Sequence, residues 1–336
     1  MLVEEERPVG AVRRPRTPWV TRTPAVARRQ PVRFVFEVLR GLAQVDFMPN
    51  AACGLFFAAA LFASGWRYGL YGLTGAVVGT ATAYALGVDR QRISQGLEGF
   101  NGCLVAVGFA VFLGPAHPST WLLAVGGSVV AGVVTGALVT VLGTWNLPTF
   151  TLPFCLVASA MTIAAPGFQR VWHAGAGLSA LPRPASGASS LGWNELWHAF
   201  FANVGQIFFM PQWYVGLLFL LGIFAADLTA GLTACFGSVV GIGTAWLLGS
   251  PARDVAQGVM GYNAVLVTMA LGGVFLVLSR WSLAYAAVGA MAATALTAAV
   301  TYVFAPFGGH TFTWPYILTT LVFLAAVPSF PRLRRA

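Results

Sequence analysis

Long apolar runs separated by short polar breaks fill most of the chain. The runs over residues 67–87 and 121–142 can each cross a bilayer as one helix, since a span needs about 20 apolar residues. Shorter runs over 51–64 and 154–165 each follow a proline-containing break. The run over 93–113 begins with glycines and polar residues, which favours a broken or re-entrant helix whose irregular backbone faces protein or water. The pattern predicts an all-α polytopic membrane protein.

The sequence motifs at these breaks occur twice, 162 residues apart and in one register. They read Gln-(Val/Ile)-x-Phe-Met-Pro, Gln-Gly-x-x-Gly-(Phe/Tyr)-Asn-x-x-Leu-Val and Thr-Phe-Thr-x-Pro, and they cover residues 44–49 and 206–211, 95–105 and 257–267, and 149–153 and 311–315. Three separated motifs with one fixed offset indicate two homologous halves.

Charge and composition divide the chain further. The arginines cluster towards both ends, and a stretch rich in Gly, Ala, Ser and Pro separates the halves. Prolines spaced among charges predict disorder at the start of the chain. We therefore predict a disordered basic arm, a first transmembrane repeat, a linker, a second transmembrane repeat and a basic tail, over residues 1–31, 32–165, 166–193, 194–328 and 329–336.

The basic termini also predict the orientation of the halves. Arginine-rich flanks stay in the cytoplasm by the positive-inside rule, so both termini are expected there. The total number of spans is then even, and two equal halves with an odd number each are inverted relative to one another. The run lengths fit about five transmembrane helices plus one re-entrant half-helix per half. Inverted repeats place a functional site at their interface, near the bilayer midplane.

Composition supports this class and weakens others. Hydrophobic residues make up 57% of the chain and charged residues 9%, whereas a soluble domain carries about 25% charged residues. The net charge of +9 comes from arginine alone. Binding of the basic arm to nucleic acid is the weaker interpretation beside anchoring at the membrane, so we expect membrane lipid, and no nucleic acid, as a partner.

The sequence shows no catalytic constellation. Its four histidines, His117, His173, His198 and His310, are far apart in sequence, and its four cysteines form no C-x-x-C pair. We expect no enzymatic activity, no metal and no cofactor.

The repeated polar features are neutral. None of Asp46, Glu98, Asp227 and Asp254 is matched by an acid in the other half. A neutral solute avoids the large cost of moving an ion into a low-dielectric site. Backbone carbonyls at helix breaks, with Gln and Thr oxygens, can accept its hydrogen bonds, and phenylalanine rings can restrict the slot to a flat molecule. The pattern favours a pathway for a small, neutral, polar solute.

These motifs resemble the urea transporter family. The resemblance is carried by Gly-Leu-Ala-Gln-Val-x-Phe, Asp-Arg-x-x-Ile-x-x-Gly-Leu-x-Gly-Phe-Asn-Gly-x-Leu-Val and Leu-Pro-x-Phe-Thr-Leu-Pro-Phe, at residues 41–47, 89–105 and 147–154, and by the second-half segments at 205–207, 258–263 and 313–316. It covers the chain from about residue 36 to 327, and the internal duplication is itself a trait of the family.

The resemblance implies a homotrimer with one pore in each subunit, between two inverted halves. It implies passive, channel-like conduction of urea in single file between facing aromatic rings, along a ladder of oxygens that accept its N–H bonds. The short termini and small size predict a bacterial urea channel, and we expect it in the inner (plasma) membrane, as a multi-pass protein. The pore residues it implies are Gln44, Val45, Phe47, Phe100, Leu104, Thr151, Gln206, Ile207, Phe209, Tyr262, Leu266 and Thr313.

The chain departs from the family pattern at a few positions. Tyr262 and Tyr316 stand where phenylalanine is usual, and the hydroxyl of Tyr262 is expected to accept or donate at that mouth of the pore. Asp46 adds an acid beside the first Gln-Val pair, which suggests a pH effect on flux unless its side chain is aimed away from the pore.

Four functions compete at this stage. The leading one is passive urea transport, and the second is conduction of a related neutral solute such as a short amide or ammonia. Proton-coupled transport or a membrane-embedded enzyme would need buried ionisable groups, which the repeated motifs lack. A purely structural trimer would not depend on Thr151 and Thr313.

Overall fold

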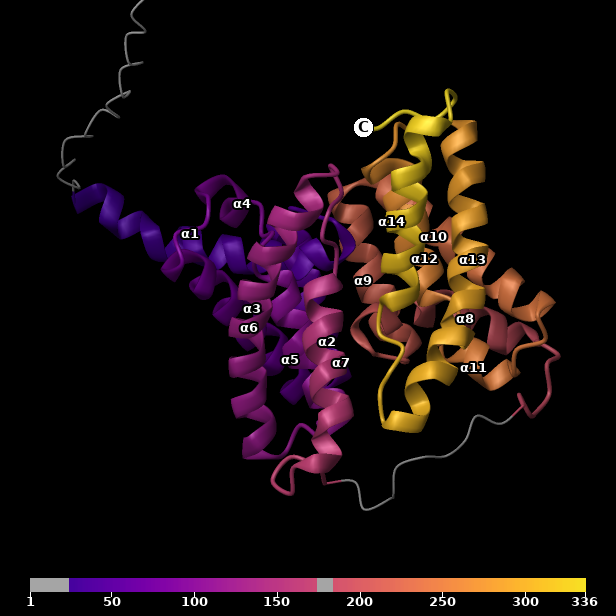
Figure 1. Cartoon of the computed structure of the whole chain (residues 1–336), viewed down its shortest axis with the longest axis horizontal. Coiled ribbons are helices and arrows are strands. Elements are labelled where there is room, and N and C mark those ends of the chain that lie inside the picture. The colour runs from indigo at the N-terminus through magenta and orange to yellow at the C-terminus, as the bar shows by residue number, and fades with distance from the viewer. Residues whose placement is uncertain (1–23, 174–183) are drawn as a thin grey trace, which may run out of the picture.

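Helices make up almost all of the structure, a computed structural model that describes residues 24–173 and 184–336 (Figure 1). The first half contains α1 (Pro24–Ala43), α2 (Ala51–Ser64), α3 (Trp66–Ala85), α4 (Arg90–Ser94), α5 (Phe100–Leu113), α6 (Pro118–Gly143) and α7 (Leu152–Ala164). The second half contains α8 (Trp193–Gly205), α9 (Trp213–Ala226), α10 (Leu228–Leu247), α11 (Ala252–Ala256), α12 (Tyr262–Met269), α13 (Arg280–Phe304) and α14 (Trp314–Ala326). The predicted all-helical fold is confirmed.

The second half repeats the first, element by element. The bounds of α2, α3, α4 and α7 return in α9, α10, α11 and α14 with the same 162-residue offset at both ends. Residues with a left-handed backbone conformation recur with the same offset. Phe47 and Phe209 have φ of 65° and 64°, and Phe150 and Phe312 have φ of 49° and 42°. The inverted orientation of the halves stays a prediction.

Each half opens with a sharply bent helix pair. The bend between α1 and α2, and that between α8 and α9, is 76°. A 3₁₀ turn over Gln44–Asp46 or Gln206–Phe208 follows the first helix of each pair, and the left-handed residue Phe47 or Phe209 ends it. In the first half the Asn50 side chain then accepts from the backbone of Ala52, at 2.8 Å, and so starts α2. The repeated Gln-x-x-Phe motif therefore forms a fixed bend.

Among the described residues, α6, α10 and α13 can each cross a membrane by length and composition, and the count there rises to five if each bent pair is one span. Several other apolar helices, α5, α7, α12 and α14, are shorter than a full span. Proline lies in the first turn of α7 and α14, where its missing N–H leaves no helical bond unmade. Five spans plus a half-helix per half stays a prediction.

Glycines let α3 pack backbone to backbone on α5. A Cβ added to Gly75 would lie 2.2 Å from the backbone oxygen of Gly102, so only glycine fits there. Gly96, in the break before α5, has a φ of +82°, and its own Cβ would lie 2.5 Å from the carbonyl carbon of Arg40. The first pair of helices and the broken segment are thus in direct backbone contact.

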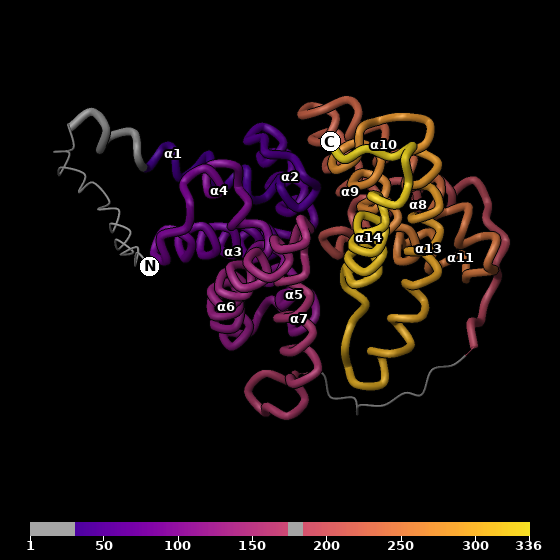
Figure 2. Tube along the Cα trace, turned by 45° about the horizontal axis from the view of Figure 1, so that its top comes forward, coloured from indigo at the N-terminus to yellow at the C-terminus, as the bar shows by residue number. Residues whose placement is uncertain are grey.

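The two halves lie side by side, with the first running from indigo to magenta and the second from orange to yellow (Figures 1 and 2). Helix α2 of the first half contacts helix α9 of the second half. The ring of Phe57 on α2 lies 4.8 Å from that of Phe219 on α9 and 5.6 Å from that of Phe208. Apolar packing therefore joins the halves next to the two bends.

The structure describes the predicted arm and the predicted linker only in part. Helix α1 begins at Pro24, inside the arm expected to be disordered, and residues 1–23 of that arm lie outside the described residues. The linker is described only in part, because residues 174–183 also lie outside the description.

Candidate functional site

Two cavities open beside the two bends. The first encloses 380 Å³ and the second 440 Å³. Their linings share pairs of residues that are 162 positions apart: Gln44 and Gln206, Phe47 and Phe209, Leu97 and Val259, Phe100 and Tyr262, Thr149 and Thr311, and Phe150 and Phe312. The repeated motifs therefore build the same kind of cavity twice.

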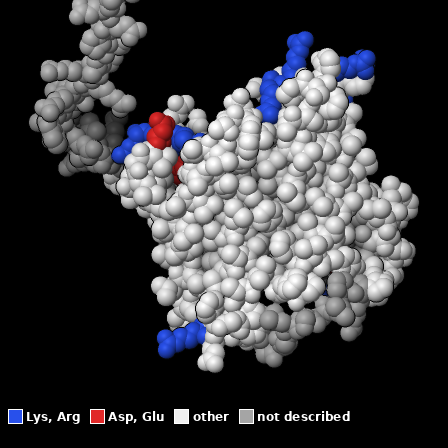
Figure 3. All heavy atoms as spheres, viewed as in Figure 1, with Lys and Arg blue, Asp and Glu red and all other residues white. Residues whose placement is uncertain are grey.

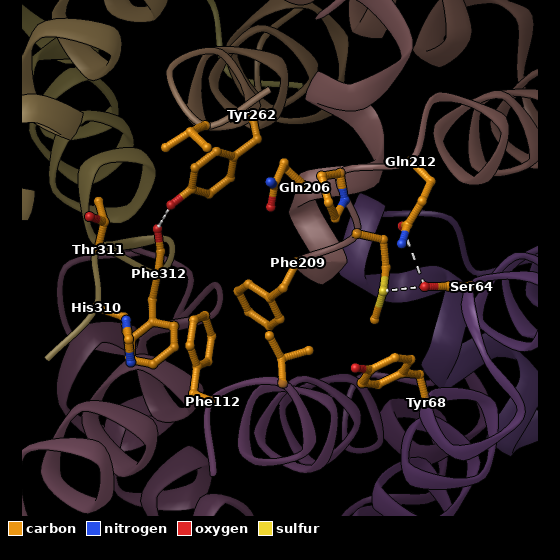
Figure 4. Close-up of a pocket in the computed structure, with 14 residues that line it drawn as sticks. Ser64, Tyr68, Phe112, Gln206, Phe209, Gln212, Tyr262, His310, Thr311 and Phe312 are labelled. Atoms are coloured by element: carbon orange, nitrogen blue, oxygen red, sulfur yellow. Dashed lines mark hydrogen bonds between the residues drawn. The ribbon is translucent and has the colours of Figure 1, made fainter. Parts of the chain in front are cut away.

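Each cavity is bordered by a cluster of aromatic rings that comes from both halves. The first aromatic cluster is Phe47, Phe150, Phe275 and Tyr316, with ring centroids 5.2–6.5 Å apart. The second aromatic cluster is Phe112, Phe154, Phe209 and Phe312, with centroids 5.1–5.9 Å apart. Figure 4 shows Phe112, Phe209 and Phe312 close together around the second cavity. Flat, rigid apolar walls of this kind fit a flat solute.

Phe275 and Phe112 occupy matching places in the two clusters although they miss the 162-residue register by one. Phe112 contacts Phe209 and Phe312, and Phe275 contacts their counterparts Phe47 and Phe150. The reason is a π-helical turn over Ala270–Val274, where the first half has a regular α-helix. A π turn takes up an additional residue, and such turns are frequent at functional sites.

The two glutamines are held in the same way. Gln44 donates its side-chain amide to the backbone oxygen of Gln95 at 2.8 Å, and Gln206 donates to that of Gln257 at 2.9 Å. Both side chains line their cavities. This bond uses one of the two N–H groups of each amide and orients the side chain, and the amide oxygen can accept a hydrogen bond from a solute.

The halves meet through two threonines between these regions. The hydroxyls of Thr151 and Thr313 lie 2.6 Å apart, and Thr313 also lies 3.2 Å from the Cys155 sulfur. Thr151 is 3% exposed and lines the first cavity, while Thr313 is fully buried. The pair comes from the two copies of one motif, so it brings identical hydrogen-bonding groups together at the centre.

Asparagines and a tyrosine fix the helix breaks. Asn101 accepts from the backbone of Phe154 at 3.1 Å, and Asn263 accepts from that of Tyr316 at 3.2 Å. Tyr262 donates its hydroxyl to the backbone oxygen of Phe312. We expected the Tyr262 hydroxyl to contact the solute at the pore mouth, and the backbone carbonyls at the helix breaks to be free acceptors. Instead, the Tyr262 hydroxyl and the Phe312 carbonyl form a hydrogen bond with each other.

The predicted pore residues fall into two groups. Most line a cavity: Gln44, Val45, Phe47, Phe100 and Thr151 the first, and Gln206, Phe209 and Tyr262 the second. The others are buried and are not among the lining residues of either cavity: Leu104, Ile207, Leu266 and Thr313.

Sequence reasoning did not name several lining residues as part of the site, including Arg92, Phe112, Phe150, Phe275, His310 and Phe312. Phe150 and Phe312 carried a signal, because they lie inside the repeated Thr-Phe-Thr motif. The others have no identical counterpart in the repeat. His310 stacks on Phe112 with ring centroids 3.8 Å apart, beside the second cavity (Figure 4).

Arg92 is the one charged side chain among the lining residues of the two described cavities. Its Nε donates to Glu98 at 2.8 Å, and Glu98 is buried behind it, outside the cavity lining. The pair therefore presents its positive member to the first cavity. Because the Glu98 carboxylate balances the guanidinium, the pair adds no net charge to the wall of the first cavity.

Histidines show one grouping that the sequence did not suggest. The rings of His117 and His173 stack 3.7 Å apart, although these residues are far apart in sequence. In the described parts of the chain no three His, Cys, Asp or Glu side chains gather as a metal site would require.

Asp46 is not among the residues that line either cavity. Its side chain is fully buried, and neither carboxylate oxygen has a hydrogen-bond partner. An enclosed carboxyl group without partners is costly, whereas an apolar side chain of similar volume avoids that cost.

The Asp46→Leu variant is accordingly expected to be more stable than the parent protein, by about 1–3 kcal/mol. The check is the melting temperature of the purified protein in detergent. Asp227→Leu is the matched control and should lower it, because the Asp227 carboxylate accepts from the Ala230 backbone at 2.6 Å and caps α10. A lower melting temperature for Asp46→Leu would show that this carboxyl group has a stabilising partner.

Comparison with known proteins is consistent with this geometry. A family model described as "Urea transporter" matches residues 35–328. The chain is 32% identical to urea transporter 1 of Capra hircus over 311 residues, which cover 90% of this chain and 80% of that protein. It is 30% identical to urea transporter 1 of Rattus norvegicus over 324 residues, which cover 94% of this chain and 82% of that protein. The match of the family model across nearly the whole helical region, at the motifs that build both cavities, shows that this chain belongs to the urea transporter family.

Proposed function

We propose that the protein conducts urea passively across a membrane, through a pathway that joins the two cavities past Thr151 and Thr313. The observation that carries this proposal is the pair of duplicated cavities, each with an aromatic wall and a glutamine, next to two hydroxyls 2.6 Å apart. Membership of the urea transporter family supports urea as the solute.

The chemistry of the walls suits urea. Urea is flat, so facing rings can hold it edge-on without a specific polar contact. Its N–H groups need acceptors once water is lost, and the amide oxygens of Gln44 and Gln206 and the hydroxyls of Thr151 and Thr313 can accept in turn. A threonine hydroxyl can also donate to the urea oxygen. Each step exchanges one hydrogen bond for another, which keeps the barrier to passage low.

We propose further that the two halves are inverted about an axis in the membrane plane. Three subunits then assemble, each with its own pathway. The trimer lies in the inner membrane of a bacterium, in contact with lipid. Exposed arginines at both ends of the described chain, among them Arg33, Arg332 and Arg334, support a cytoplasmic location of both termini. Figure 3 shows most of the visible basic side chains towards one edge of the molecule.

Stopped-flow light scattering of proteoliposomes tests the function. Urea should enter vesicles that hold the protein at least ten times faster than protein-free vesicles, and an imposed proton gradient should not drive urea accumulation. Formamide, acetamide and ammonia serve as comparison solutes. Urea entry no faster than in protein-free vesicles, or accumulation against the urea gradient, would contradict the proposal.

A further inference from the structure

The last residues of the chain fold back over the second half and reach the first. In Figures 1 and 2 the segment after α14 runs from the end of that helix towards the first half. Residues 330–336, which we call the strap, are held along their length. Phe330 lies 5.9 Å from the ring of Tyr285, and the Arg332 guanidinium lies 4.4 Å over the ring of Trp281. Leu333 packs against the apolar core.

The end of the strap pairs with the segment that carries Phe275. The backbone of Val277 donates to Arg334 at 2.9 Å, and that of Ala336 donates to Phe275 at 3.0 Å. Leu276 and Arg335 form an isolated antiparallel bridge between these bonds. This segment directly follows the π-helical turn, so the pairing fixes a stretch that a regular helix does not.

The Arg335 side chain links the strap to the other wall of the first cavity. It donates to the backbone oxygen of Asn146, at 2.8 Å, and to that of Leu324 near the end of α14, at 2.9 Å. Asn146 has a left-handed φ of 52° and starts the loop that leads through Phe150 to Thr151. One guanidinium thus binds a loop of the first half and a helix of the second, while its own backbone pairs beside Phe275.

We propose that Arg335 is a positioning residue for the first cavity: through the strap it holds Phe275 against Phe47 and Phe150, and so sets the width of the slot that these rings border. The spacings that it maintains are 5.8 Å from Phe275 to Phe47 and 5.3 Å from Phe275 to Phe150. The proposal rests on the proposed function, because the width of the slot matters only for a solute that passes through it. Loss of the link lets the wall recede, and wider analogues of urea gain more from this than urea does.

The experiment measures the permeability of N-methylurea relative to urea in proteoliposomes. We expect Arg335→Ala to raise this ratio at least threefold, and Arg335→Lys to restore part of the difference, since an ammonium can still donate to one of the two carbonyls. Arg334→Ala is the matched control. It removes the same charge from the neighbouring position but keeps the backbone oxygen that binds Val277, so the ratio should stay at the parent value.

A double-mutant cycle separates positioning from general destabilisation. Phe275→Ala removes the ring itself and should raise the ratio by at least as much as Arg335→Ala. The double variant should then show little further rise, because both changes act on the same ring. If Arg335→Ala fails to fold, Arg335→Met replaces it in the cycle, since methionine keeps much of the side-chain length but donates to neither carbonyl.

Two results would overturn the proposal: an unchanged ratio in folded Arg335→Ala or Arg335→Met, or independent effects of the two sites in the cycle. Neither result can be confused with failure of the proposed function. If the proposed function is wrong, the parent protein admits urea no faster than protein-free vesicles do. If only the proposal about Arg335 is wrong, the urea flux of the parent protein is unaffected.

Discussion

Replacing Thr151 and Thr313 together by valine should reduce urea flux by ~5- to 160-fold, because losing the hydrogen bonds at this one buried point of the path costs about 1–3 kcal/mol in total. The two hydroxyls lie 2.6 Å apart where the halves meet, and both side chains are almost fully buried. Valine keeps their shape but neither accepts nor donates. A urea molecule that leaves one glutamine would then find methyl groups in place of its next partners. Stopped-flow urea entry into proteoliposomes measures the change.

Serine and distant threonines provide the controls. The pair Thr151→Ser with Thr313→Ser keeps both hydroxyls and should keep most of the flux. Thr135→Val with Thr294→Val changes two buried threonines whose hydroxyls bond to the backbone of their own helices, at Ala131 and Ala290, so it should leave the flux unchanged. Equal flux through the parent and the Thr151/Thr313 valine pair would contradict a central role for these residues, and would favour a protein whose motifs serve packing alone.

The Gly75→Val variant is expected to lose about 3 kcal/mol of stability, at the upper end of the usual cost of overpacking. A Cβ at this position would lie 2.2 Å from the Gly102 backbone oxygen and 2.8 Å from the Cβ of Ala106. The obstacle is backbone, which cannot rotate away as a side chain can, so α3 and α5 must separate. The melting temperature in detergent and the yield of monodisperse protein measure the loss.

Gly126→Val tests whether the effect belongs to the contact or to the loss of any glycine. A Cβ on Gly126 in α6 meets nothing within 4 Å, so this change should cost far less. If both variants melt at the same temperature, close approach of α3 and α5 is not what Gly75 provides.

The sequence by itself determined the class, the repeat and the position of the breaks. Long apolar runs with few charges indicate membrane spans, and polar, glycine- and proline-containing segments at matching places between those runs indicate breaks in the helices. The structure has these breaks at the predicted places, and the Gln-x-x-Phe and Thr-Phe-Thr motifs do lie along the two cavities. These features follow from local chemistry, which a sequence records directly.

Only the tertiary structure decided what each side chain faces. A single π-helical turn moves Phe275 one residue out of the repeat and into the first aromatic cluster, which no fixed offset could reveal. Asp46 sits in a cavity-forming motif but is fully buried, and the Tyr262 hydroxyl is bound to Phe312. Thr151 and Thr313 are far apart in sequence and meet only because the halves pack together. Direction and contact depend on helix register and on packing between distant segments, whereas a motif specifies only the order of its residues.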